Sequence, residues 1–384
     1  MRVKLLGMEN DNGGLTPLAR AEALVPKIVA AADEIDAQRE LPTAVADAIK
    51  DAGLFRLLVP RSVGGEEMDW LEYLDVVRTI AYADGSTGWC FNQGAVFATT
   101  CCRAPEALAE EVWGDPRTVI GNGPPQGNID LEHVEGGFRL SGRWMFSSGC
   151  RHANWIAAVS GGRGEPPRLH LLPRDDVEFL DVWQVSGLRG TGSFSFRVEN
   201  LFVPDEHTMR LDVPPREPGP IYVIPQGLMF ACGFGSVALG VSRAALDATI
   251  ELCSDKRPRF GSRTLCEDPV IQQQIGKAEA RWQAAKALLF ESAGNVWQSV
   301  SATGQITMAG RIQLRMAGTH AIRESAGVVD IAYNLSGSTA IFHDRAIQRR
   351  FQDAHVITQQ VQGREAHYET AGQYFLGLDP KGVI

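Results

Sequence analysis

Residues 138–150 read Phe-Arg-Leu-Ser-Gly-Arg-Trp-Met-Phe-Ser-Ser-Gly-Cys, and this stretch decides the fold. From Phe138 to Phe146, apolar or small residues occupy every second position, and the positions between them hold arginine, serine or methionine. This period of two predicts a strand with one buried face. The turn formers Glu135-Gly136-Gly137 directly before it predict a hairpin. We therefore expect a β domain near the middle of the chain.

The sequence on either side of this strand predicts a three-part organisation. Further strands are expected at 155–159, 169–172 and 194–198, and a proline-rich linker at 212–219. Both flanks read as helical, with an Ala-rich run over 17–35, another over 41–53 and a third from Trp70. A long apolar stripe at 4-3-4-3 spacing predicts a bundle after the linker, through Ile271, Ile275, Ala278, Trp282, Ala285, Leu289, Ala293 and Val296.

The resulting domain prediction is an N-terminal helical domain over 1–115, a middle β domain over 116–212 and a C-terminal helical bundle over 213–384. At 384 residues and 41.8 kDa the chain is long enough for two or three domains and a buried cofactor. The formal net charge is -9, so no basic field is expected to hold nucleic acid or anionic lipid. We also expect no stretch that approaches the length of a membrane span.

Cysteine usage and the N-terminal sequence indicate the compartment. The seven cysteines are odd in number and dispersed, without a CxxC pair or a Cys/His cluster at metal-binding spacing. The apolar run at residues 1–7 is too short for a signal peptide. We therefore expect a cytoplasmic protein with reduced thiols and no metal site.

Three segments in this order carry a family resemblance. They are Trp144-Met-Phe-Ser-Ser-Gly-Cys150, Gly187-Leu-Arg-Gly-Thr-Gly-Ser193 and Phe202-Val-Pro204. Together with Arg349-Arg-Phe-Gln-Asp-Ala-His355, they resemble the acyl-CoA dehydrogenase superfamily, and more closely its branch of two-component flavin-dependent monooxygenases. The resemblance covers nearly the whole chain. It implies a mainly helical α+β fold with a β barrel-like middle domain and a four-helix C-terminal bundle, assembled as a homotetramer.

The resemblance also implies the reaction. Reduced FMN or FAD reacts with O2 to a C4a-hydroperoxyflavin, and one oxygen is transferred to an aromatic or other electron-rich small molecule. The segment Gly233-Phe-Gly235-Ser-Val-Ala238 formally fits the dinucleotide motif GxGxxA, but it continues into a helical pattern and no βαβ unit surrounds it. Nothing visible therefore binds NAD(P)H, and we expect a separate NAD(P)H:flavin reductase to supply reduced flavin.

Candidate site residues follow from the chemistry of a flavin and from the resemblance. The isoalloxazine ring is a flat apolar tricycle with a polar edge, so its site needs an aromatic wall and hydroxyl or amide donors. The resemblance places Ser148, with Ser147 as second candidate, at flavin N5, and sets the glycine-rich loop 187–193 beside the substrate. The predicted cofactor-binding residues are Trp144, Phe146, Ser147, Ser148, Arg257, Gln272 and Ser338, and the predicted substrate-binding residues are Trp89, Arg189 and Thr191.

His355 is the predicted proton donor or acceptor, together with Ser148 as a catalytic residue. It lies four residues after Phe351 and eight after Ile347, which predicts that all three share an inward helical stripe. A neighbouring imidazole can hold or deliver a proton near neutral pH. Some members of the branch carry a second histidine where this chain has Gln360, so proton handling here can differ.

Two alternatives stay open at this point. The first is an acyl-CoA dehydrogenase that passes electrons to an electron-transfer flavoprotein. Many such enzymes place a carboxylate base eight residues after the aspartate of an Asp-Ala pair, but the count from Asp353 reaches Val361, which cannot remove a proton. Glu365 and Glu369 are nearby in sequence. The second alternative is a helical assembly protein with a vestigial pocket.

Overall fold

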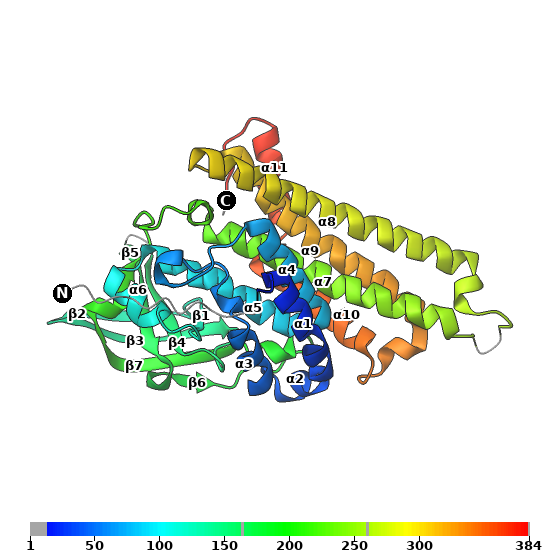
Figure 1. Cartoon of the computed structure of the whole chain (residues 1–384), viewed down its shortest axis with the longest axis horizontal. Coiled ribbons are helices and arrows are strands. Elements are labelled where there is room, and N and C mark those ends of the chain that lie inside the picture. Colours follow the sequence, from blue (N-terminus) through cyan, green and yellow to red (C-terminus); the bar gives the residue numbers. More distant parts are fainter. Residues whose placement is uncertain (1–13, 163–164, 259–260, 383–384) are drawn as a thin grey trace.

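The computed structural model describes residues 14–162, 165–258 and 261–382. Helices form one layer beside two small sheets, and long helices of a C-terminal bundle extend away from them (Figure 1). The helices that precede the sheets are α1 (Pro17–Ala30), α2 (Ala32–Gln38), α3 (Thr43–Asp51), α4 (Trp70–Ala83), α5 (Gly85–Ala98) and α6 (Glu106–Trp113).

Two four-stranded sheets form the β part of the described chain. The first sheet has the order β1-β4-β5-β8 and the second the order β2-β3-β7-β6. Most strand pairs are antiparallel, whereas β1 and β4 run parallel. The strands are β1 (Ile120–Gly123), β2 (Asp130–Val134), β3 (Gly137–Ser147), β4 (Trp155–Gly162), β5 (Glu165–Pro173), β6 (Glu178–Leu180), β7 (Phe194–Pro204) and β8 (Thr208–Arg210).

Trp144 connects the two sheets. Its ring is fully buried and stacks on Phe196, its cross-strand partner in β7, with 5.0 Å between the ring centroids. Its indole Nε1 donates a hydrogen bond of 2.9 Å to the carbonyl of Val159 in β4 of the other sheet. A buried indole N–H needs such an acceptor. Trp144 therefore belongs to the core between the sheets.

The C-terminal bundle consists of α7 (Gln226–Asp255), α8 (Pro269–Thr303), α9 (Met308–Ser336), α10 (Ala346–Gln359) and α11 (Ala366–Phe375). The predicted stripe faces inward on α8 from Ala278 to Val296, whereas Ile271 and Ile275 before it are only half-buried. Side-chain caps stabilise the starts of α8 and α9: Asp268 accepts the Val270 N–H at 2.7 Å, and Thr307 accepts the Gly310 N–H at 3.1 Å.

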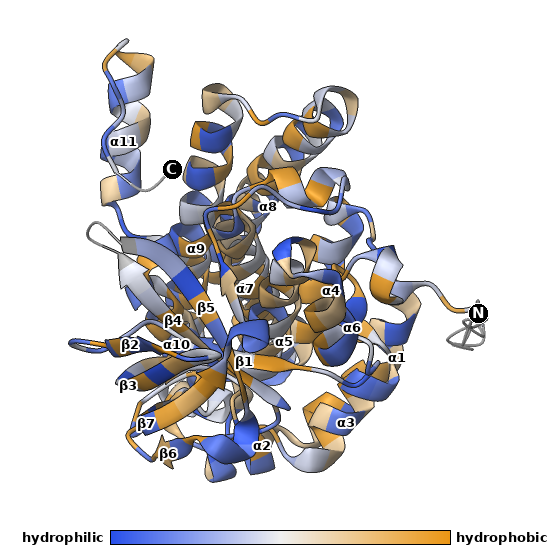
Figure 2. Cartoon of the chain, turned by 90° about the vertical axis from the view of Figure 1, so that its left-hand side faces the viewer, coloured by the Kyte–Doolittle hydropathy of each residue, from blue (hydrophilic) through white to orange (hydrophobic). Residues whose placement is uncertain are grey.

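Helix α7 corrects one prediction from the sequence. An 18-residue window of this helix is apolar enough to span a membrane by composition, although no such stretch was expected. In the fold, 83% of that window is buried, with α4 and α9 packed against the helix. Its apolar surface therefore contributes to the core of the bundle. Figure 2 shows the same pattern, with hydrophobic residues concentrated where the elements pack together.

Other sequence predictions are confirmed. The strand from Phe138 is β3, and the hairpin before it turns at Gly136, whose φ of 77° suits glycine. The GxGxxA segment lies inside helix α7, as its helical pattern indicated. Helix α5 was not foreseen, because its sequence is buried on nearly all sides and has no amphipathic period.

Candidate active site

A cavity of about 460 Å³ lies between the helical and β parts of the chain. This volume is within the range of small-molecule sites. Its walls come from segments far apart in the sequence: helix α5, the end of β1, the end of β3, the loop before β7 and the C-terminal end of α10. The lining residues are Trp89, Gln93, Asn122, Gly123, Pro124, Phe146, Ser148, Trp183, Leu188, Thr191, Ser193, Val356, Gln359, Gln360 and Val361.

None of these lining residues carries an ionisable side chain. Aromatic rings dominate one part of the surface, and Phe146, 54% exposed, lies edge-on to Trp183 at the opening. Two lining residues, Phe146 and Leu188, have left-handed backbones with φ of 55° and 49°. Such conformations are unusual for residues with side chains and cluster at functional sites.

A cluster of three hydroxyl groups forms the first polar part of the cavity. Ser148 Oγ lies 2.7 Å from Ser193 Oγ, which lies 2.7 Å from Thr191 Oγ1. The indole Nε1 of Trp89 donates to Ser148 Oγ at 3.1 Å. Trp89 is held in turn by stacking on Phe234, with 3.8 Å between the centroids. The cluster is thus a fixed polar edge in a mainly apolar cavity.

Carboxamides form the second polar part. Gln93 Nε2 donates to Asn122 Oδ1 at 2.9 Å, and the buried Nδ2 of Asn122 has no hydrogen-bond partner within the described chain. Gln359 and Gln360 line the cavity from the end of α10. A buried donor without a partner is costly unless a ligand or water accepts its proton. The arrangement therefore suits a flat, neutral ligand with hydrogen-bonding groups on its edge.

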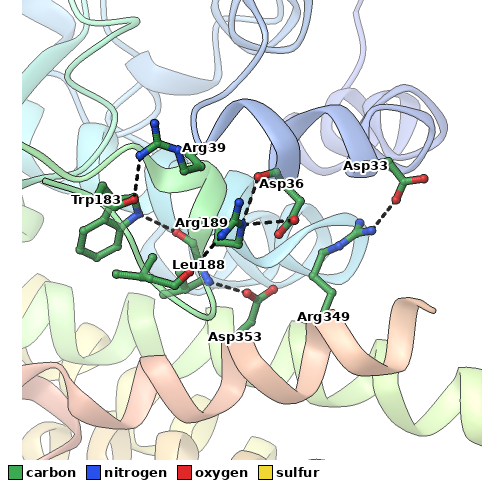
Figure 3. A network of polar contacts seen from close by, with 9 residues as sticks. Asp33, Asp36, Arg39, Trp183, Leu188, Arg189, Arg349 and Asp353 are labelled. Carbon is green, nitrogen blue, oxygen red and sulfur yellow. Dashed lines mark hydrogen bonds and ion pairs between the residues drawn. The ribbon is translucent and has the colours of Figure 1, made fainter. Parts of the chain in front are cut away.

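The loop that carries Leu188 is held from two sides (Figure 3). On one side, Arg189 pairs with Asp36 of α2 at 3.2 Å. On the other, Asp353 of α10 accepts the Leu188 N–H at 2.6 Å. A Cβ at Gly187 would lie 2.4 Å from the backbone of Gln352 in the same helix, so only glycine permits this approach. The cavity wall is therefore fixed to both helices.

Comparison with known proteins identifies the family. Residues 19–104 match the family "Acyl-CoA dehydrogenase, N-terminal domain", and residues 232–363 match "Acyl-CoA dehydrogenase, C-terminal domain". An indole-3-acetate monooxygenase of Pseudomonas putida is 35% identical over 90% of both chains. The chain belongs to the flavin-dependent monooxygenases of the acyl-CoA dehydrogenase superfamily.

Other relatives agree with this assignment. The oxygenase subunit HsaA of a flavin-dependent monooxygenase from Rhodococcus jostii is 31% identical, over 88% of this chain and 92% of that protein. The crystal structure of 3-HSA hydroxylase from Rhodococcus sp. RHA1 superimposes with a TM-score of 0.88 at 28% identity, covering 96% of this chain and 99% of that one. The predicted superfamily, fold and flavin-dependent oxygenase activity are therefore confirmed.

Several residues predicted from the sequence lie at the cavity of this monooxygenase. Ser148, Phe146, Thr191 and Trp89 all line it. The lining combines aromatic rings with neutral polar groups, which fits the flat isoalloxazine ring of a flavin and its polar edge. The lining residues that sequence reasoning missed include Asn122 and Trp183, because nothing in their local sequence marks them as close to residues 89 or 148.

Three other predicted residues point away from the cavity. Trp144 was predicted in the flavin wall, but it is in the core between the sheets and does not line the cavity. Ser147 is buried outside the cavity lining, and its hydroxyl has no hydrogen-bond partner within the described chain. Arg189 turns toward α2, where it bonds to Asp36 and to the carbonyl of Val185. It holds the loop and does not line the cavity.

Arg257, Gln272 and Ser338 lie at the other end of the bundle. Arg257 follows α7, Gln272 is in the first turn of α8 and Ser338 follows α9, and all three are exposed. Helix α10, of 14 residues, runs from this end to the cavity, a length of about 20 Å at 1.5 Å per residue. These residues therefore do not reach the described cavity within one chain. Arg259 and Phe260, which follow Arg257 closely in the sequence, lie outside the described residues.

The acyl-CoA dehydrogenase alternative lacks its base in this cavity. Gln359, Gln360 and Val361 line it at the place where the sequence count located the base. Glu365 and Glu369 are exposed and are not among the lining residues. Because no lining residue within the described chain carries a carboxylate, the site has no group to abstract a carbon-bound proton.

His355 lies outside the cavity lining. Its Nε2 is 2.9 Å from Asp330 Oδ1 on α9, its ring packs edge-on against Phe351, and its side chain is 44% exposed. The neighbouring Val356 faces the cavity instead. Of the predicted inward stripe, Ile347 is buried and Phe351 is half-buried, whereas His355 turns away from the buried face that includes Asp353 and Ile357.

Replacing His355 by alanine is expected to leave the rate of substrate oxygenation within about twofold of the wild type, because His355 pairs with Asp330 and is not among the described residues that line the cavity. Steady-state product formation with a saturating supply of reduced flavin measures this. Asp330→Asn is the matched control, since it alters the same ion pair from the other side. If His355→Ala lowers the oxygenation rate tenfold while Asp330→Asn keeps the wild-type rate, His355 takes part in the reaction and this prediction is wrong.

Proposed function

We propose that this chain is the oxygenase component of a two-component system that receives reduced FMN or FAD from a separate NAD(P)H:flavin reductase. Relatives named oxygenase subunit and oxygenase component support the division into two proteins. The GxGxxA segment is buried within α7, which supports the view that the motif does not bind the nicotinamide nucleotide here. The bound flavin supplies the oxygen-activating chemistry, and the chain supplies the binding site.

Within the cavity, we propose that Ser148 lies at flavin N5, while Phe146 and Trp183 limit the access of water at the opening. Support comes from the position of Ser148 on the polar edge of the lining and from the edge-on contact between the two rings. Exclusion of water matters because water access favours loss of oxygen as hydrogen peroxide. Gln93 and Asn122 are then available to hydrogen-bond a substrate.

We propose that the substrate is an electron-rich aromatic molecule that carries no charge on the part that enters the cavity. Among the described residues, the lining offers carboxamides and hydroxyls but no cation to neutralise a carboxylate. Burying an unpaired carboxylate is strongly unfavourable, whereas neutral hydroxyl or N–H groups are satisfied by amides. The substrate class therefore differs from the acid in the name of the indole-3-acetate monooxygenases.

The purified chain, supplied with reduced flavin and ¹⁸O₂, is expected to place one ¹⁸O atom in indole at a kcat/KM about tenfold or more above that for indole-3-acetate. Mass spectrometry of the products and measurement of hydrogen peroxide give both the incorporation and the coupling. Equal or better use of indole-3-acetate would contradict the neutral-substrate proposal. Peroxide formation without ¹⁸O in either product would contradict oxygenation of this aromatic class.

We further propose a cytoplasmic homotetramer. All seven cysteines are free thiols, and six of them are buried, which suits a reducing compartment. Exposed apolar side chains at the C-terminal end offer surface for contact between copies: Phe375, Leu376 and Leu378.

A further inference from the structure

The hydroxyl cluster at the cavity is a chain that begins at a backbone carbonyl. The hydroxyl of Thr191 lies 2.8 Å from the carbonyl oxygen of Leu188, and the chain continues through Ser193 to Ser148. Thr191 and Ser193 are 1% and 3% exposed, so solvent water does not compete for their protons. All three side chains line the cavity, and Ser148, at the end of the series, also accepts a hydrogen bond from the Trp89 N–H.

The number of hydroxyl protons determines which group is the donor in each hydrogen bond of this series. Three oxygen pairs lie 2.7 to 2.8 Å apart, and each needs a proton between its atoms, because two unshared lone pairs at that distance repel. Three hydroxyl protons are present, one on each side chain. The carbonyl of Leu188 cannot donate, so Thr191 donates to it. Ser193 must then donate to Thr191, and Ser148 must donate to Ser193.

The consequence falls on Ser148. Ser148 donates its single hydroxyl proton to Ser193, and one of its two lone pairs accepts a hydrogen bond from the Trp89 N–H. The group that Ser148 offers to a ligand is therefore its remaining lone pair. The sequence-based expectation was a hydroxyl donor at this position, whereas the surrounding residues make it an acceptor.

We propose that Thr191 and Ser193 are positioning residues that make Ser148 a hydrogen-bond acceptor and thereby select reduced over oxidised flavin. This rests on the proposed placement of Ser148 at flavin N5. Reduced flavin carries a hydrogen on N5 and donates it, whereas oxidised flavin presents a bare lone pair there. Ser148 therefore bonds to the reduced ring and opposes the oxidised one, which favours release of the flavin after turnover.

If Ser148 acted as a donor to the flavin, the three hydroxyl groups would lose one buried hydrogen bond. If Ser148 donated to oxidised N5, Ser193 would have to donate to Ser148 and Thr191 to Ser193. The 2.8 Å contact between Thr191 and the Leu188 carbonyl would then hold no proton. Removing the Thr191 hydroxyl removes this penalty, because Ser193 can then turn its proton toward Ser148.

The test compares wild type, Thr191→Val and Thr191→Ser. Valine matches threonine in shape without the hydroxyl, and serine keeps it. Dissociation constants for reduced and oxidised FMN and FAD are measured by anaerobic equilibrium dialysis, with no turnover required. We expect the wild type to bind reduced flavin more tightly, and Thr191→Val to lower the ratio of oxidised to reduced Kd by about tenfold, the value of one hydrogen bond. Thr191→Ser is expected to keep the wild-type ratio within about twofold.

The proposal is overturned if folded Thr191→Val keeps the wild-type ratio of oxidised to reduced flavin Kd. It is also overturned if Thr191→Ser lowers this ratio as much as Thr191→Val does. If Thr191→Val does not fold, Ser193→Ala serves instead, because it leaves the Ser148 proton without its acceptor and is expected to lower the ratio similarly. A wild type that binds neither flavin state would contradict the proposed function itself. Wild-type preference for reduced flavin that persists in both Thr191→Val and Ser193→Ala would contradict only the role of the hydroxyl chain.

Discussion

Asp353→Asn is expected to stabilise the protein at pH 8 and to leave it nearly unchanged near pH 4. The carboxyl of Asp353 is 2% exposed and accepts the Leu188 N–H, but its Oδ2 has no hydrogen-bond partner within the described chain. Burial, and then the negative charge of Asp84, raise its pKa from 3.8 to about 7, against the opposing effects of the Leu188 N–H and of Arg350. Asparagine keeps an acceptor for Leu188 without a charge.

The sign of the pH dependence follows from linkage. Because the folded-state pKa of Asp353 lies above the unfolded value, the folded state favours the protonated form. Its contribution to stability is fully present below pH 3.8 and is lost as the pH rises through 7. At about 1.4 kcal/mol per pKa unit, the wild type should lose on the order of 4 kcal/mol relative to Asp353→Asn between pH 4 and pH 8.

Urea unfolding at several pH values measures this difference directly. Asp330→Asn is the control, because Asp330 is an exposed aspartate whose removal should change stability by less than about 1 kcal/mol. If Asp353→Asn is instead less stable than wild type at pH 8, the carboxylate is charged in the fold and Arg350 neutralises it. The positive charge of Arg350 already acts to lower the pKa of Asp353, and its guanidinium bonds to the carbonyls of Tyr82 and Ala83.

Trp144→Ala is expected to reduce the free energy of unfolding by about 4 kcal/mol, as is usual when a large buried aromatic residue is truncated. The substitution removes the stack on Phe196 and the hydrogen bond to Val159 in the other sheet. Trp144→Phe keeps most of the stack and loses only the N–H, so a cost of about 1 kcal/mol is expected. Denaturant titration at pH 7 gives both values.

Phe146→Ala is the matched control two residues along the same strand. Phe146 is 54% exposed at the cavity opening, so its loss should cost less than about 1 kcal/mol. The sequence predicts an aromatic wall of the flavin site for both residues, whereas in the fold only Phe146 lines the cavity and Trp144 packs in the core. If Phe146→Ala were the more destabilising substitution, the assignment of Trp144 to the core and Phe146 to the cavity would be wrong.

The reason for this difference lies in the backbone at the end of β3. Alternation places Trp144 and Phe146 on one face of the strand. The pairing with β7 shifts register between Trp144 and Ser147, and Phe146 has a left-handed φ of 55°. Such an irregularity re-aims side chains beyond it. Ser148 therefore reaches the cavity while Ser147 does not, which no period in the sequence reveals.

Helix α10 gives a second example. The spacing of Ile347, Phe351 and His355 predicts one inward face, because apolar residues at i and i+4 usually share it. In the fold the buried face is centred on Asp353 and Ile357, one step around the helix, and His355 pairs with Asp330. Ile347 is buried as predicted and Phe351 is half-buried, so the prediction is wrong for His355. A buried aspartate that anchors a loop runs against the usual pattern of apolar burial, and the sequence alone did not reveal it.

The sequence by itself determined the order of helices, sheets and bundle, the membership of the family, and the cavity residues Ser148, Phe146, Thr191 and Trp89. The order of the elements follows from local periods, and the family and the cavity residues follow from short motifs and the family resemblance that they carry. Only the tertiary structure decided which neighbour faces the cavity, that Asn122 and Trp183 join it, and that Ser148 accepts a hydrogen bond. Those properties depend on a register shift, on contacts between distant segments and on a count of shared protons, and none of these is encoded in a local pattern.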